Sequence, residues 1–165
     1  MRALAPLLAL LLLAPLAACE EGEETRSRAE RPPADHGPVP DAAEDPLGHA
    51  LHGFGKELLP RMAPEGTVLR GRLRRGEVED HPAILLGTHC YAILGVGGEG
   101  VTDLDVLLID PVGAAIMHDT DTGPRATLGV REQICPAQAG QFEIRVRVFE
   151  GEGDYAVRLY SYQVI

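Results

Sequence analysis

Five aspartates between residues 103 and 121 have the side-chain chemistry that a calcium ion requires. Calcium binds six to eight oxygen ligands, which come from carboxylates and carbonyls and often lie on loops. Asp103 and Asp105 would point to the same side of one strand, while Asp119 and Asp121 lie in the loop sequence HDTDTG. Two interpretations stay open: a calcium site formed by Asp103, Asp105, Asp119 and Asp121, with Asp110 close by, or aspartates that form turns and a solvated strand face.

A second pattern, GVGGEG at Gly95–Gly100, matches the G-x-G-x-x-G spacing of dinucleotide-binding loops. In those loops the last glycine opens a helix, whose N-terminus receives the pyrophosphate. Here Gly100 is followed by VTDLDVLLID, in which apolar and polar residues alternate as they do in a strand. The pattern therefore predicts a turn that joins two strands, and it excludes a nucleotide site.

Residues suited to nucleophilic catalysis are scarce. Beyond the N-terminal segment the chain has two serines, Ser27 and Ser161, and neither lies in a G-x-S-x-G motif. A cysteine nucleophile would require Cys90 or Cys135 to be free with a lowered pKa. No HExxH or CxxC motif accompanies the six histidines, which we expect at the surface or in turns: His36, His49, His52, His81, His89 and His118. We therefore expect that the protein is not an enzyme.

The N-terminus, MRALAPLLALLLLAPLAAC, has the features of a secretory signal. Arg2 precedes an apolar stretch, and two small residues end it just before Cys19. LAAC resembles the lipobox of bacterial lipoproteins, which implies a signal peptide at residues 1–18 and acyl chains such as palmitate on Cys19. The alternative is an ordinary signal peptide with an incidental cysteine. An acylated Cys19 would anchor the protein to a lipid bilayer, stably so if it carries more than one chain.

The charge balance excludes some partners. Without residues 1–18 the chain keeps 14 Lys and Arg against 25 Asp and Glu. Nucleic acids and anionic lipid surfaces attract clusters of Lys and Arg. We therefore expect no nucleic-acid partner, and attachment to a membrane would depend on the acyl chains.

Residues 19–45 differ in composition from the rest of the chain. Residues 20–45 contain nine acids and four prolines, so they have little apolar surface to bury and are predicted to be a disordered acidic tether. A short helix is predicted over residues 46–62, with Asp45 as N-cap and Pro46 at the first helical position. Three glycines within this stretch weaken the helix prediction.

From residue 67 onward the hydrophobic pattern has a period of two. QFEIRVRVFE, at residues 141–150, alternates most regularly, and CYAILGV and DLDVLLID follow the same rule. Turn sequences such as DPVG and EGEGD separate the runs, and no helical pattern lies between them. The sequence predicts an all-β, antiparallel, jelly-roll-like sandwich of seven or eight strands over residues 67–165, preceded by the short helix.

Three parts of this strand pattern carry a family resemblance. GVTDLDVLLIDPVG, MHDTDTG and AGQFEIRVRVFEGEGDYAVRLY together resemble the bacterial pre-peptidase C-terminal (PPC) domain, over about residues 67–162. The resemblance implies a compact β-sandwich. Such domains accompany secreted peptidases, and some bind collagen or other polymers, sometimes with calcium. This chain departs from that pattern, because it has no peptidase domain and because Cys90 and Cys135 are not part of the family pattern.

If Cys19 carries lipid, Cys90 and Cys135 remain as an even pair in an exported chain, which favours a disulfide over two buried free thiols. These observations together predict a non-catalytic lipoprotein anchored in the bacterial cell envelope, with a binding or scaffold domain whose partner is an unidentified envelope protein or polymer. The alternative is a calcium-dependent module that binds an extracellular protein or polysaccharide. Calcium is the one cofactor that the sequence suggests.

Overall fold

A computed structural model describes residues 31–164, and this part of the chain contains eight strands and one helix. The predicted signal peptide, Cys19 and the tether as far as residue 30 lie outside the described residues. The elements are α2 (Pro46–Leu58), β1 (Ala63–Leu73), β2 (Val78–Leu85), β3 (His89–Gly97), β4 (Val101–Ile109), β5 (Ala115–His118), β6 (Arg125–Leu128), β7 (Gly140–Gly151) and β8 (Gly153–Gln163).

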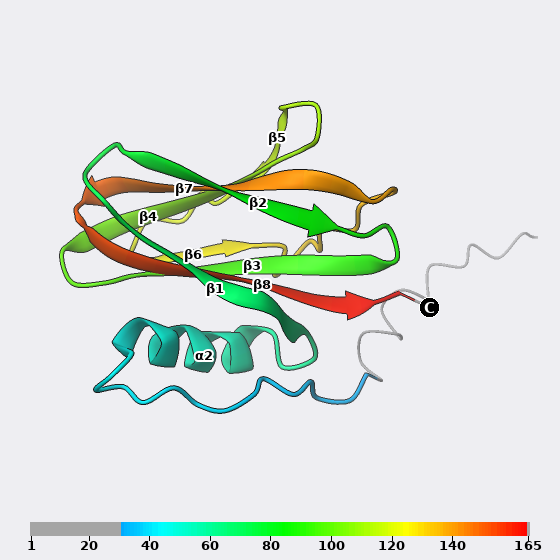
Figure 1. Ribbon diagram of the computed structural model, residues 1–165, viewed down its shortest axis with the longest axis horizontal. Helices are drawn as coiled ribbons and strands as arrows, with labels where there is room; N and C mark the ends of the chain where they lie inside the picture. Colours follow the sequence, from blue (N-terminus) through cyan, green and yellow to red (C-terminus); the bar gives the residue numbers. More distant parts are fainter. Residues whose placement is uncertain (1–30, 165) are drawn as a thin grey trace, which may run out of the picture. The chain divides into compact units, whose positions relative to one another are not determined.

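The strands form two four-stranded antiparallel sheets. The order is β1-β8-β3-β6 in the first sheet and β2-β7-β4-β5 in the second. Figure 1 shows the two sheets as layers, with α2 covering the outer face of the first. In each sheet, strands from the two halves of the chain alternate, which is the arrangement of an eight-stranded jelly roll. The predicted all-β sandwich with a short N-terminal helix is confirmed.

Two hydrophobic clusters lie on opposite faces of the first sheet. The larger cluster fills the space between the sheets and includes Tyr91 and Ile93 of β3. The smaller cluster lies between the first sheet and α2, and it includes Ala92 and Leu94 of β3 together with Leu51 of the helix. Because both faces of β3 are covered, the strand is buried along almost its whole length.

The start of α2 follows the prediction. Asp45 is the N-cap, its Oδ1 accepts the backbone N–H of Gly48 at 2.8 Å, and Pro46 opens the helix. At two of the glycines that weakened the helix prediction, a neighbouring side chain occupies the place of a Cβ. A Cβ at Gly48 would lie 2.0 Å from Asp45 Oδ2, and a Cβ at Gly55 would lie 2.3 Å from the Tyr160 hydroxyl. The absence of a Cβ therefore leaves room for the capping carboxylate of Asp45 at Gly48 and for the Tyr160 ring of β8 at Gly55.

Element boundaries differ from the sequence prediction at three places. The helix ends at Leu58 rather than at residue 62, and β1 begins at Ala63 rather than at Thr67. Residues 32–45, predicted as part of the disordered tether, are placed against the domain. The backbone N–H of Ala34 donates to Pro60 O at 2.8 Å, and His36 is buried. No helix in the described part is long and apolar enough to cross a membrane.

Candidate functional site

The crossing between β5 and β6 forms a pocket that contains two of the predicted calcium ligands. Its volume is about 590 Å³, and its lining includes Phe54 of α2, the segment from His118 to Asp121 and residues 127–132. Arg125 also lines it, with its guanidinium 5.0 Å from the centre of the Phe54 ring. Two backbone hydrogen bonds fix the crossing segment to both sheets. Gly123 O accepts from Leu104 N–H of β4, and Pro124 O accepts from Gly97 N–H of β3.

Asp119 is the most unusual group in this pocket. It is 8% exposed, and its Oδ2 has no hydrogen-bond partner among the described residues. Burial raises the pKa of the Asp119 carboxyl, the nearby carboxylates of Asp121 and Asp105 raise it further, and backbone hydrogen bonds from Thr127 and Asp121 oppose the rise. The pocket therefore presents a buried carboxyl with an oxygen that could accept a hydrogen bond or bind a cation.

Two of the other aspartates singled out in the sequence, Asp103 and Asp110, accept backbone hydrogen bonds that hold the fold. Asp103 is buried, and its Oδ1 accepts the backbone N–H of Gly123 at 3.0 Å. The pKa of Asp105 is raised by burial and then by Asp103, while Arg147 lowers it. Asp110 accepts the backbone N–H groups of Val112 and Ala114, as a turn residue does.

The four aspartates are thus electrostatic neighbours without forming a metal cage. Within residues 31–164, no three His, Cys, Asp or Glu side chains are placed to hold one metal ion together. A calcium ion here would therefore need backbone carbonyls and water in addition to Asp119.

Replacing Asp119 with asparagine is expected to stabilise the domain at neutral pH by roughly 1 kcal/mol, because a buried, partly unpartnered carboxylate is costly. A raised folded-state pKa means that the cost is absent below the unfolded pKa of 3.8, grows as pH rises from there toward the folded pKa, and is complete above the folded pKa. The advantage of Asp119→Asn should therefore disappear near pH 4. Urea unfolding at pH 4 and pH 7.5 measures this.

The exposed neighbour provides the matched control. Asp121→Asn removes a charge from the same loop, and it should change the stability far less because Asp121 is already solvated. Equal effects of the two substitutions, or a loss of stability in Asp119→Asn at pH 7.5, would contradict the assignment.

A hydrogen-bonded network inside the sandwich was not predicted. The Tyr155 hydroxyl donates to Glu79 Oε2 at 2.7 Å, and His81 Nε2 lies 2.6 Å from the same hydroxyl. Tyr155 is fully buried, and burial together with Glu79 raises its pKa far above the usual range. Gly71 makes the room, because a Cβ there would lie 2.3 Å from Glu79 Oε2. The network links β2 of one sheet to β8 of the other, and its one sequence signal was the spacing of Glu79 and His81.

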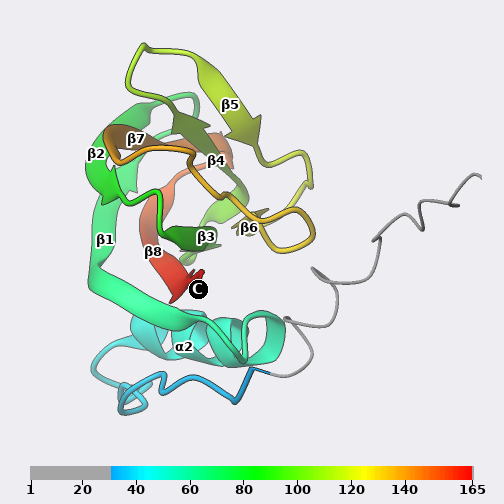
Figure 2. The same ribbon diagram turned by 90° about the vertical axis from the view of Figure 1, so that its right-hand side faces the viewer.

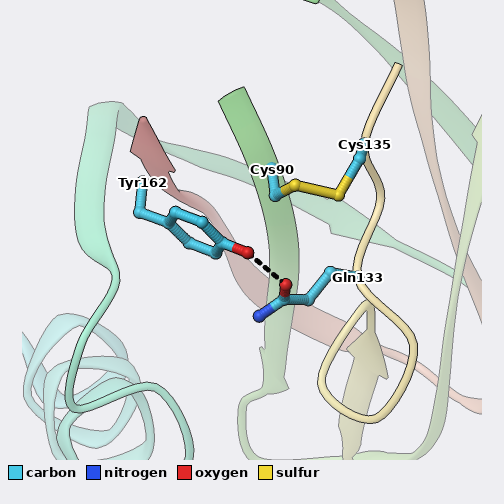
Figure 3. Close-up of a disulfide and its surroundings, with 4 residues drawn as sticks. All are labelled: Cys90, Gln133, Cys135 and Tyr162. Atoms are coloured by element: carbon cyan, nitrogen blue, oxygen red, sulfur yellow. Dashed lines mark hydrogen bonds between the residues drawn. A yellow bond between two sulfur atoms is a disulfide. The ribbon is translucent and has the colours of Figure 1, made fainter. Parts of the chain in front are cut away.

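The predicted disulfide between Cys90 and Cys135 is confirmed, with a Cα–Cα distance of 4.2 Å and a sequence separation of 45 residues. Figure 3 shows it joining β3 to the irregular segment before β7, beside the hydrogen bond from the Tyr162 hydroxyl to Gln133 Oε1. Tyr91 and Ile134 exchange both backbone hydrogen bonds next to it. The disulfide therefore fixes this segment to the first sheet.

Two solved structures are similar to part of the chain. One is a pre-peptidase C-terminal domain of a collagenase from Bacillus anthracis, with 13% identity, a TM-score of 0.45, and coverage of 56% of this chain and 87% of that one. The other is PliG from Aeromonas hydrophila, a periplasmic inhibitor of g-type lysozyme, with 11% identity, a TM-score of 0.44, and coverage of 58% and 85%. No family model and no curated protein matches. Both TM-scores are low, so the fold described above rests on the sheets themselves.

Proposed function

We propose that the protein is a non-catalytic lipoprotein, anchored through an acylated Cys19, whose jelly roll is a binding or scaffold module in the bacterial cell envelope. The disulfide between Cys90 and Cys135 is the observation that carries this proposal. Structural disulfides form in oxidising compartments outside the cytosol, as an exported chain requires. The LAAC sequence that ends at Cys19 supplies the anchor. The partner would be an envelope protein or polymer.

The nucleophiles of the described part support a non-catalytic role. Ser161, the one serine in residues 31–164, is buried and donates to Glu65 Oε1. Cys90 and Cys135 are bonded to each other, so neither is available as a thiolate. The hydroxyl groups that line the pocket around Asp119 belong to two threonines, Thr120 and Thr127, so its lining includes neither Ser161 nor a cysteine.

Metabolic labelling tests the anchor. Bacteria that express the full chain are supplied with an alkyne analogue of palmitate, and the protein is expected to carry the label and to sediment with membranes. Cys19→Ser should lose the label completely, because the thiol is the acceptor of the lipid. The double variant Cys90→Ser/Cys135→Ser is the matched control and should keep the label. An unlabelled wild type, or a labelled Cys19→Ser variant, would refute lipid anchoring.

A calcium-dependent binding module is the second candidate, and the unpartnered Asp119 Oδ2 favours it. A ligand that binds only the folded state at about a hundred times its Kd adds roughly 2.7 kcal/mol of stability. The thermal melting curve of the full chain in EDTA and in millimolar calcium tests this. A rise in Tm that is absent in Asp119→Asn would support a calcium site, and unchanged curves would remove the candidate.

A further inference from the structure

The segment of residues 32–45, which we call the strap, lies along α2. Figures 1 and 2 show it running beside the helix on the side away from the sheets. Besides the bond from Ala34 to Pro60, the ring of His49 on the helix lies 2.9 Å from Pro40 O through its Nδ1. The strap is therefore fixed at several points, although its composition predicted disorder.

His36 is the buried contact of the strap. It is 8% exposed, its ring centre lies 5.9 Å from that of Tyr160 and 6.2 Å from that of His52, and a hydrogen bond to the Leu59 backbone orients it. Its Nε2 has no hydrogen-bond partner within the described part of the chain. Burial lowers the pKa of His36, so the docked strap favours the neutral ring.

His52 of α2 is likewise a buried histidine with an unpartnered ring nitrogen. It is also 8% exposed, and its Nε2 lacks a hydrogen-bond partner in residues 31–164. Burial lowers the pKa of His52, and the charges of Lys56 and Arg158 lower it further. A proton on either ring would therefore be buried without a counter-ion.

The groups whose charge acts on the two rings come from both elements beneath the strap, and no acid is among them. Lys56 and His49 lie on α2, and Arg158 lies on β8 with its Nε buried. Tyr160, which packs against His36, has its pKa raised by burial and stays neutral.

The strap's own Asp35 and Asp41 accept backbone N–H groups within the strap. The two rings also repel each other when both are protonated, because the charge of His52 lowers the pKa of His36.

We infer that the strap is a pH-dependent clasp, docked on α2 and β8 while His36 and His52 are neutral and released when they are protonated. After release both rings become solvated and regain the ordinary pKa of 6.5. Docking is therefore strongest above pH 6.5 and weakens as pH falls below it. At pH 5, each histidine that stays neutral in the docked state weakens docking by about 30-fold.

Release would add residues 32–45 to the link between Cys19 and the jelly roll, which would let the domain move further from the membrane. This consequence rests on the proposed anchor, whereas the clasp itself does not. Loss of palmitate labelling would refute the anchor and leave the clasp intact, so the two can fail separately.

Hydrogen exchange of the full chain tests the clasp. The amide of Ala34, which donates to Pro60 O, reports docking of the strap. After correction for the intrinsic effect of pH on exchange, its protection is expected to fall between pH 8 and pH 5, by up to about 30-fold for each histidine that stays neutral in the docked state. Amides of the central strand β3 should keep their protection. Unchanged protection at Ala34, or an equal loss in β3, would overturn the inference.

Two substitutions and a control sharpen the test. His36→Phe keeps an aromatic ring against Tyr160 but cannot be protonated, and His52→Gln removes the second titrating ring, so each should remove part of the pH dependence. His89→Gln changes a histidine of β3 that contacts Thr88 and Tyr91, and it should leave the pH dependence unchanged. If His36→Phe prevents docking altogether, NMR titration of the His36 and His52 ring signals in the wild type decides the question. Titration midpoints well below pH 6.5 support the clasp, and midpoints near pH 6.5 overturn it.

Discussion

Removing the disulfide by the double substitution Cys90→Ala/Cys135→Ala is expected to lower the free energy of unfolding by about 4 kcal/mol. The bond closes a loop of 45 residues, and the loss of loop-closure entropy in the unfolded chain gives this figure. In a domain of this size the Tm should fall by roughly 10–15 °C. Thermal unfolding followed by circular dichroism measures the change.

The reduced wild-type protein is the natural control for this prediction. Treatment with a thiol reductant should lower its Tm by a similar amount and should leave the double variant unchanged. The segment fixed by the disulfide should become the first region to exchange its amides, because Ile134 would then be fixed to the sheet mainly by its two backbone bonds to Tyr91. A loss below about 1 kcal/mol would contradict the entropic account.

Gly100→Ala is expected to cost about 3 kcal/mol or more. Gly100 has a φ of +90°, which disfavours any residue with a Cβ, and that Cβ would lie 2.4 Å from the backbone oxygen of Glu152. The neighbouring hairpin carries this oxygen and cannot move away as a flexible side chain would. Urea unfolding followed by far-ultraviolet circular dichroism measures the loss, since the chain has no tryptophan.

Gly113 separates the two causes. Its φ is +88°, almost the same as that of Gly100, but an added Cβ would meet nothing within 4 Å. Gly113→Ala should therefore cost about 1–2 kcal/mol, the strain of the backbone alone. If both substitutions cost the same, the contact with Glu152 has no energetic weight.

The GVGGEG sequence shows how far local pattern could lead. The alternation after Gly100 predicted correctly that a turn joins two strands here, but only Gly98 and Gly100 lie in that turn, since β3 ends at Gly97 and β4 begins at Val101. Why Gly100 must be glycine could not be predicted. The oxygen that excludes a Cβ belongs to Glu152, on a hairpin far along the chain, and only the folded structure brings the two together.

The candidate site was predicted in part for the same reason. The types and spacing of the aspartates predicted that they lie near one another, and Asp105 and Asp119 do interact electrostatically, whereas calcium binding stays a prediction. Their spacing could not reveal that Asp103 would accept a backbone bond while one oxygen of Asp119 would stay unpartnered. The expectation that histidines lie at the surface was wrong for His36 and His52, because the strap and α2 bury each other's rings.

The sequence by itself determined what depends on neighbours along the chain: strands from the period of two, the helix start from Asp45 and Pro46, and turns from glycine and proline. The tertiary structure alone decided the jelly-roll order, the burial of both faces of β3, and the network around Tyr155. The physical reason is that periodicity records which side of a segment is apolar, whereas the partner that covers that side is chosen by packing between residues far apart in sequence.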